Sequence, residues 1–234
     1  MTALSLLASA IAPGVALLSY FYLKDRYEAE PIASVAKMFA LGFLTVFPTM
    51  VIQRGFVLGL GDHPLLFAFG ISAGIEEFIK WFLVFYLVYR NTLITAPYDG
   101  IVYATAVSLG FATMENVMFS LLYRPSFQDL LYRALLPVSG HALFGVLMGF
   151  HFGKAKFKPG LVRRHLVLSY VQPVLWHGAF DFIMLRMSSY WLLAMVPFMI
   201  ALWARSLRKM NRANRMPFMP VPGDKKIKIS ANGQ

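Results

Sequence analysis

Six ionisable side chains interrupt long apolar stretches of this sequence. Carboxyl and imidazole groups are expensive to bury among apolar groups, so they usually face a protein interior and mark a functional site or pathway. Together they could activate water for hydrolysis, bind a divalent metal ion or relay protons. The candidate catalytic residues are Glu76, Glu77, Glu115, His141, His177 and Asp181.

The spacing of these residues indicates which of them share a helix face. His177 and Asp181 are four residues apart, as are Glu76 and Lys80, so each pair projects from one face of a helix. Glu77 points about 100° away from Glu76, so the two carboxylates should have different roles. Each pair also has a purely structural alternative, an ion pair or a local hydrogen bond within a helix bundle.

The elements that must position these residues are membrane-spanning helices. The chain has 234 residues, of which 58% are hydrophobic and 14% charged, whereas soluble domains carry about 25% charged residues. A helix needs about 20 apolar residues to cross a bilayer. We therefore predict an all-α, polytopic transmembrane helix bundle of about seven spans, with the polar site in the bundle core. The apolar runs are 1–23, 34–52, 64–89, 101–123, 135–152, 166–185 and 190–204.

Depth along the spans suggests that the polar residues meet. At a rise of ~1.5 Å per residue, Glu76, Glu115, His141, His177 and Asp181 lie ~8–17 Å from the outer ends of their spans. Agreement in depth among successive spans predicts one buried site in the middle or outer half of the bilayer.

The basic residues indicate the orientation. Lys and Arg crowd the loop at 154–164 and the segment after 204, and such residues favour the cytoplasmic side. We predict a multi-pass membrane protein, with the N-terminus outside and the C-terminus in the cytoplasm. The net charge of +11 follows this loop distribution, so nucleic acid is not an expected partner. The chain has no cysteine, which excludes a thiol nucleophile and thiolate-ligated metal.

Several motifs carry a family resemblance in the right order along the chain. They are IAPG at 11–14, KDRYEAEP at 24–31, EEFIKW at 76–81, SLGFATMEN at 108–116, LPVSGHA at 136–142 and HGAFD at 177–181. This pattern resembles the PrsW family of intramembrane proteases, over residues of about 10–210. The family is similar to the wider CAAX prenyl endopeptidase and bacteriocin-processing group. The chain departs from that group at three positions. Lys80 is one residue closer to the Glu pair than the group's Arg. Glu115 stands in place of His, and Asp181 in place of Asn.

The resemblance implies an intramembrane endopeptidase of the bacterial cell membrane. Its substrate would be a single-span membrane protein such as an anti-sigma factor, cut first on the extracytoplasmic side to start a stress response. Residues 1–210 would form the membrane-embedded protease domain, in contact with the lipid bilayer, and 211–234 a basic, disordered cytoplasmic tail.

We assign roles on this basis. Glu76 is expected to be the general base, Asp181 to orient His177 or join the ligand set, and Glu77 to hold the helices or tune Lys80. A divalent metal ion, Zn²⁺, would be held by Glu115, His141 and His177, because two imidazoles and a carboxylate with one open position form a known catalytic zinc site. Residue chemistry alone leaves open a proton- or ion-coupled transporter that uses the same cluster, and a non-catalytic scaffold.

Overall fold

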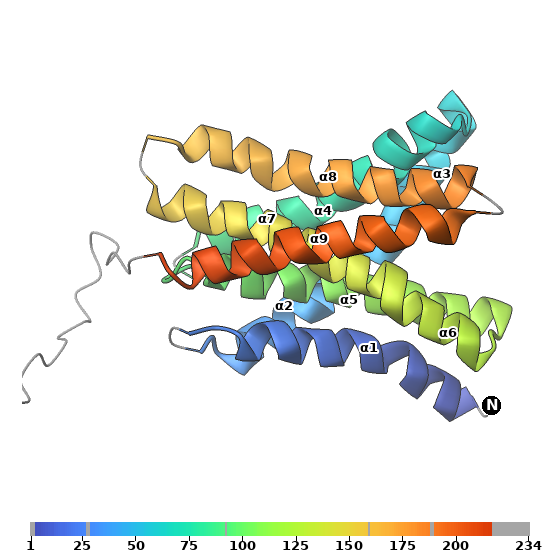
Figure 1. Ribbon diagram of the computed structural model, residues 1–234, viewed down its shortest axis with the longest axis horizontal. Helices are drawn as coiled ribbons and strands as arrows, with labels where there is room; N and C mark the ends of the chain where they lie inside the picture. The colour runs from blue at the N-terminus through green and yellow to red at the C-terminus, as the bar shows by residue number, and fades with distance from the viewer. Residues whose placement is uncertain (1–2, 27–28, 92, 159, 188–189, 217–234) are drawn as a thin grey trace, which may run out of the picture.

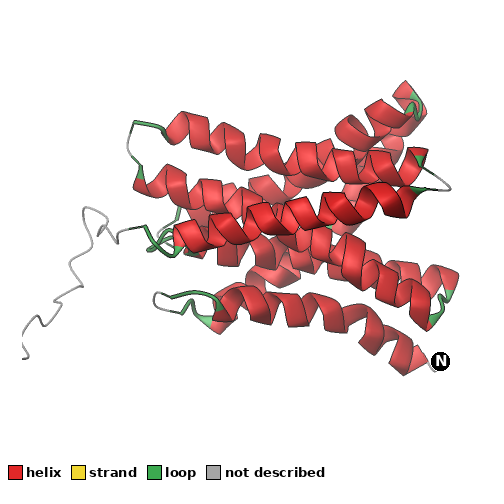
Figure 2. Cartoon of the chain, viewed as in Figure 1, coloured by secondary structure: helices red, strands yellow, loops and turns green. Residues whose placement is uncertain are grey.

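The structure is a computed structural model that describes residues 3–26, 29–91, 93–158, 160–187 and 190–216. In this part of the chain every regular element is a helix, as the all-α prediction expects (Figure 2). Three segments, labelled η, are π-helical turns that continue neighbouring α-helices. The elements are α1 Ala3–Leu23, α2 Ile32–Leu44, α3 Val46–Leu60, η1 Leu66–Ser72, α4 Ala73–Val84, η2 Phe85–Tyr89, α5 Asp99–Tyr123, α6 Phe127–Arg133, η3 Ala134–Val138, α7 Ser139–Phe157, α8 Val162–Arg186 and α9 Trp191–Ala213.

Five helical stretches among the described residues are long and apolar enough to cross a membrane. The prediction of about seven spans is therefore not confirmed. Two further helical stretches, 66–89 and α8, have comparable length but carry the polar cluster, which lowers their apolar character. The five apolar stretches are Leu4–Leu23, Ile32–Leu60, Asp99–Tyr123, Phe127–Phe157 and Trp191–Ala213.

Two spans are longer than the apolar runs suggest. The helix before α7 begins at Phe127, because Ser126 and Asp129 form a capping box with their side chains and backbone N–H groups. Pro137 then lies inside η3, where the wider π turn accommodates a residue that cannot donate a backbone hydrogen bond. Likewise, α2 and α3 form one stretch with a distortion at Thr45, whose hydroxyl donates to the Gly42 carbonyl at 2.7 Å.

The connections between helices gather at two ends of the bundle (Figure 1). The N-terminal end of α1 lies at one end together with the connections at 61–63, 124–126 and around 190. The C-terminal ends of α1, η2 and α7 lie at the other end, with the C-terminal end of α9. The basic end of α7 and the basic end of α9 therefore lie at the same end of the bundle. The expected basic tail lies outside the described residues from 217 onward.

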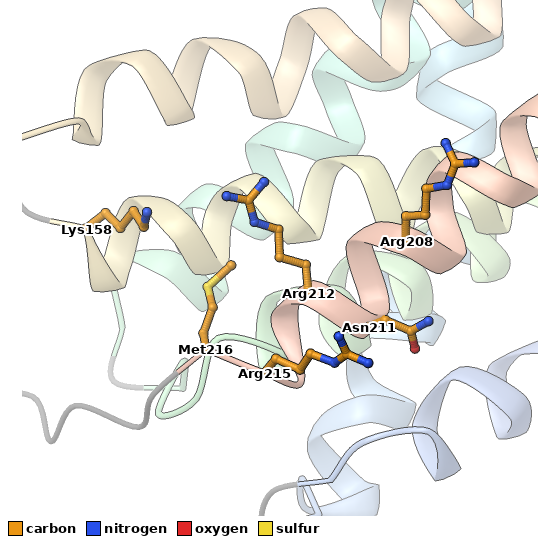
Figure 3. Close-up of a pocket in the computed structure, with 6 residues that line it drawn as sticks. All are labelled: Lys158, Arg208, Asn211, Arg212, Arg215 and Met216. Atoms are coloured by element: carbon orange, nitrogen blue, oxygen red, sulfur yellow. The ribbon is translucent and has the colours of Figure 1, made fainter.

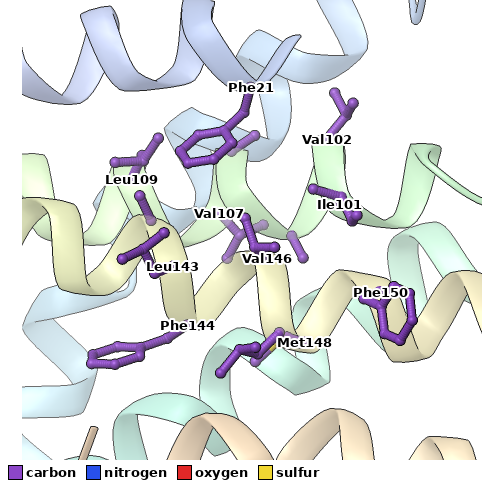
Figure 4. Close-up of a cluster of buried hydrophobic side chains, with 14 of the residues drawn as sticks. Phe21, Ile101, Val102, Val107, Leu109, Leu143, Phe144, Val146, Met148 and Phe150 are labelled. Atoms are coloured by element: carbon purple, nitrogen blue, oxygen red, sulfur yellow. The ribbon is translucent and has the colours of Figure 1, made fainter. Parts of the chain in front are cut away.

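Helix α5 is the centre of the bundle and is buried along almost its whole length. It packs closely on α7 through glycines: a Cβ at Gly145 would lie 2.9 Å from the Thr105 Cα, and a Cβ at Gly149 would lie 2.6 Å from the Ile101 Cα. Such close approach is typical of small residues at membrane helix interfaces. Apolar side chains fill the space on either side (Figure 4). This contact fixes α5 and α7, which carry two of the candidate site residues.

Candidate active site

All six candidate residues lie in one cluster where four helices meet. Glu76 and Glu77 come from α4, Glu115 from α5, His141 from α7, and His177 and Asp181 from α8. Six ion pairs with N–O distances of 4 Å or less join these residues and Lys80.

Lys80 links three members of the cluster. Its ammonium group donates to Glu77 Oε1 at 2.8 Å and to Glu76 Oε2 at 3.4 Å. It also lies 3.0 Å from His141 Nδ1. A charged ammonium has no acceptor, so His141 Nδ1 must accept this hydrogen bond. The hydrogen of a neutral His141 ring is then on Nε2, which is 2.9 Å from Glu115 Oε2.

His177 contacts three carboxylates. Its Nδ1 lies 3.0 Å from Glu77 Oε1, and its Nε2 lies 3.8 Å from Glu76 Oε2 and 3.5 Å from Asp181 Oδ2. The His141 and His177 rings are 4.9 Å apart between centroids and nearly perpendicular, at 84°. The two imidazoles thus form one pair, with a carboxylate next to each Nε2 atom.

Exposure separates the cluster into two groups. Glu77 and Lys80 are fully buried, and Glu76, His141 and His177 are nearly so. The side chain of Glu115 is 30% exposed and that of Asp181 is 19% exposed. These two carboxylates are therefore the members most accessible to water or a substrate.

Three members of the cluster suit a metal ion. Glu76, His141 and His177 each offer a ligand atom, and these atoms lie within 4.8 Å of one another. The set of two nitrogens and one oxygen is typical of catalytic zinc. Several buried carboxylates with a single ammonium also leave an excess of negative charge that a divalent cation would offset. The residues therefore fit a metal, with Glu76 rather than the expected Glu115 completing the set.

Sequence reasoning missed several residues that support the cluster. Gln53 of α3 donates from Nε2 to Glu76 Oε1 at 3.1 Å. The Phe111 ring lies 4.2 Å from the Lys80 ammonium, and the Phe144 ring stacks on His177 at 4.8 Å. The signal for Gln53 in the sequence is a neutral amide next to an apolar run. The direction in which its side chain points depends on the rotation of α3.

A second supporting contact was also missed. Arg133 of α6 donates from Nε to Asn116 Oδ1 at 2.8 Å. Asn116 directly follows Glu115 in the chain. The sequence places Arg133 near the outer side and gives no indication of this partner. The contact ties α6 to the part of α5 that carries Glu115.

The fold and the cluster define a class of helical, membrane-type proteins with buried acidic and imidazole groups between their helices. Residues 30–204 match a family model described as PrsW family intramembrane metalloprotease, and the chain belongs to this family.

Relatives named Protease PrsW match most of the chain. The protein of Geobacillus kaustophilus is 50% identical over 212 residues, which cover 89% of this chain and 92% of that protein. The protein of Bacillus subtilis is 45% identical over 221 residues, covering 93% and 99%. That of Clostridioides difficile is 30% identical over 217 residues, covering 89% and 91%. No solved structure matches the chain.

Proposed function

We propose that this protein is a membrane-embedded endopeptidase that cleaves a single-span membrane protein. The observation that carries the proposal is the grouping of Glu76, His141 and His177 from three helices, with ligand atoms within 4.8 Å of one another. The names of the relatives support the same activity.

The proposed metal is Zn²⁺, held by Glu76, His141 and His177. Glu77 accepts a hydrogen bond from His177 Nδ1, which leaves Nε2 as the ligand nitrogen, and such a carboxylate–histidine contact is common around metal ligands. The arrangement at His141 differs: Lys80 donates to Nδ1, which places the ring hydrogen on Nε2, so Nε2 would bind an ion only after Lys80 releases Nδ1 and the hydrogen moves there. When bound, the ion would polarise the peptide carbonyl and make water a stronger nucleophile.

Glu115 is the proposed general base in place of Glu76. It is the most exposed carboxylate of the cluster, at 30%, and it lies 2.9 Å from His141 Nε2. From this position its side chain can take a proton from an attacking water and return it to the leaving amine. Asp181 Oδ2 lies 3.5 Å from His177 Nε2 and would place a further negative charge beside the proposed ion, since a ligating Nε2 has no hydrogen to donate to it.

The proposal is tested with purified Glu76→Gln and Glu115→Gln variants, by measuring bound metal and cleavage of a single-span substrate. Glu76→Gln should lose both metal and cleavage. Glu115→Gln should keep the metal and lose cleavage by about 10²–10⁴-fold, the usual contribution of a general base. Asp62→Asn, which removes an exposed carboxylate outside the cluster, is the control and should keep both.

Two results would contradict these assignments. A Glu76→Gln protein with a full complement of metal would return Glu76 to the role of base and Glu115 to that of ligand. Full activity of the wild-type protein in a metal-free preparation would leave a glutamate-dependent hydrolase without a metal.

The proposed substrate is a membrane-anchored anti-sigma factor, cut on its extracytoplasmic side. Family membership supports a membrane protein substrate. The outer position of the cut follows from the orientation that the basic loops favour. Co-reconstitution with a single-span anti-sigma factor should yield a cleaved product whose new terminus maps to the outer half of its span. A new terminus on the cytoplasmic side would refute the outer cut.

A further inference from the structure

A basic pocket lies where the C-terminal ends of α7 and α9 meet (Figure 3). We use the name basic pocket for a cavity of about 520 Å³ lined by Lys158, Arg208, Asn211, Arg212, Arg215 and Met216. Lys158 and Arg212 extend toward each other from the two helices. Four of the six lining residues carry a positive charge, and none is acidic.

Two further lysines lie behind the pocket. Lys154 is 8% exposed, and its charged neighbours include Arg212 and Lys158. The ammonium groups of Lys154 and Lys209 lie 4.8 Å and 4.3 Å from the same Phe150 ring. Two like charges on one aromatic ring raise the positive potential at the pocket.

The partners of these lysines are neutral groups. Lys209 Nζ lies 3.1 Å from His151 Nε2, so that nitrogen accepts a hydrogen bond. His151 Nδ1 in turn lies 3.0 Å from His165 Nδ1, and both rings are buried. An aromatic ring and an imidazole attract a cation but do not neutralise it. Among the described residues, neither Lys154 nor Lys209 forms an ion pair with a carboxylate.

Acidic residues are rare in the part of the sequence that contains the basic pocket. Between Asp129 and Asp224 the chain has a single acidic residue, Asp181, which belongs to the candidate active site. Within the described ranges, no carboxylate forms an ion pair with a residue of the basic pocket. An anionic ligand in the basic pocket would therefore meet four positive side chains without displacing any of the ion pairs found among the described residues.

The position of the pocket identifies the kind of anion. It lies at the ends of two apolar stretches, Phe127–Phe157 and Trp191–Ala213, at the depth where a spanning helix meets lipid headgroups. Guanidinium groups bind phosphate oxygens through paired hydrogen bonds. Basic pockets between membrane helices are suited to anionic lipid headgroups.

We propose that the basic pocket binds the phosphoryl group of an anionic phospholipid headgroup. This inference does not depend on the proposed protease activity, because the pocket shares no residue with the candidate active site. A bound lipid would tie the ends of α7 and α9 together and lower the repulsion among their basic residues.

The test uses full-length protein in detergent, with bound lipid measured by native mass spectrometry. Phosphatidylglycerol should bind more tightly than phosphatidylcholine. The double variant R208Q/R212Q should bind phosphatidylglycerol about 30-fold more weakly, because each basic residue near an anionic lipid contributes about 1 kcal/mol. Both arginines are exposed, so the variant should fold, and its thermal unfolding without lipid checks this.

The matched control is K37Q/R90Q, which removes two positive charges that line a separate pocket and are not part of the basic pocket. It should keep phosphatidylglycerol affinity within about threefold. Equal losses in both double variants would reduce the effect to diffuse attraction and overturn the proposal. Equal binding of the two lipids by wild type would also overturn it.

A further experiment distinguishes a lipid headgroup from free phosphate as the source of the phosphoryl group. Inorganic phosphate is added in the absence of lipid, and thermal unfolding is compared with sodium chloride at equal ionic strength. No shift with phosphate, together with tight phosphatidylglycerol binding, supports the lipid headgroup. A phosphate-specific shift that R208Q/R212Q abolishes, without tight lipid binding, would overturn the lipid assignment in favour of a soluble phosphate.

Discussion

Lys80 is the residue on which the charge balance of the site depends. It is fully buried, and its ammonium group contacts Glu76, Glu77 and His141. Removing one partner from a buried ion pair leaves an uncompensated charge and costs about 3–5 kcal/mol. One ammonium cannot neutralise all the carboxylates of the cluster. The remaining negative charge is a physical reason for a divalent cation at this position.

Gln53 offers a prediction at the residue scale. Gln53→Leu removes the hydrogen bond to Glu76 Oε1 while keeping similar volume, so Glu76 loses its fixed orientation. We expect metal affinity to fall about 10–100-fold, as is typical when a group that orients a metal ligand is lost. Competition with a chelator measures the affinity. Gln128→Leu, which removes an exposed amide on α6, is the control. Equal affinities in the two variants would show that Gln53 does not position Glu76.

Residue types and depth made the members of the cluster predictable, but not their pairing. Glu76, Glu115, His141 and His177 were expected at similar depth, and they lie in one cluster. Depth cannot distinguish which carboxylate is nearest to both imidazoles, because that depends on helix rotation and crossing angle. For this reason the ligand set expected from the sequence contains Glu115, whereas the ligand set proposed from the structure contains Glu76.

At the element scale, the glycines of α7 determine how closely it approaches α5. Gly145 and Gly149 are four residues apart and so share one face of α7, and in the structure both face α5 backbone. Helix existence was predictable from apolar length, while the start at Phe127 and the π turn around Pro137 were not. Those features depend on a local capping box and on which backbone groups neighbouring turns can satisfy.

Gly149→Ala tests this packing. A Cβ at this position would lie against the Gly100 carbonyl and the Ile101 Cα, which are backbone atoms that cannot rotate away. We expect a loss of stability of about 1–3 kcal/mol, as for other overpacked positions. Gly55→Ala is the control, because nothing lies within 4 Å of its Cβ. That variant should be neutral or slightly stabilised. Reversible unfolding in mixed micelles gives both values, and equal stabilities would contradict the close contact.

We predict that the stability of the protein depends on pH through Glu30, in the segment before α2. Burial, together with the nearby charges of Asp99 and Asp25, raises the pKa of Glu30 from 4.5 to about 8. The Tyr103 hydroxyl donates to Glu30 Oε2 at 2.5 Å and partly opposes this shift. Between pH 4.5 and about 8 the folded state holds a proton on Glu30 that the unfolded state releases. The stability that this proton contributes is therefore present below pH 4.5 and is lost as the pH rises through about 8.

Glu30→Gln removes this dependence because an amide does not titrate. The melting temperatures of the variant and the wild type should therefore diverge as the pH rises from about 5 to 9, with the variant the more stable at high pH. Thermal unfolding by tryptophan fluorescence measures this at each pH. Asp62→Asn, at an exposed carboxylate in another loop, controls for general charge effects. A constant difference between Glu30→Gln and wild type would exclude the raised pKa.

At the scale of the whole molecule, the two ends of the bundle differ in charge. The C-terminal ends of α1, η2 and α7 share one end with the C-terminal part of α9, and the basic ends of α7 and α9 lie there. The positive-inside rule assigns this end to the cytoplasm. The same assignment requires that 66–89 and α8 cross the membrane, although their polar residues keep them outside the five apolar stretches. An experiment that shows which side of the membrane each connection faces therefore tests the orientation and the number of spans together.

Reporter fusions answer it. A fluorescent protein active in the cytoplasm should be active when fused after Asn91, after Arg164 or at Gln234, and inactive after Asp62 or Ser126. Alkaline phosphatase, which needs the oxidising outer compartment for its disulfides, should give the opposite pattern at the same positions. If 66–89 did not cross, Asp62 and Asn91 would report the same side. A full reversal of the pattern would move the candidate site to the cytoplasmic half of the bilayer. The extracytoplasmic cut would then be excluded, while the hydrolase chemistry of the Glu/His cluster would be unaffected.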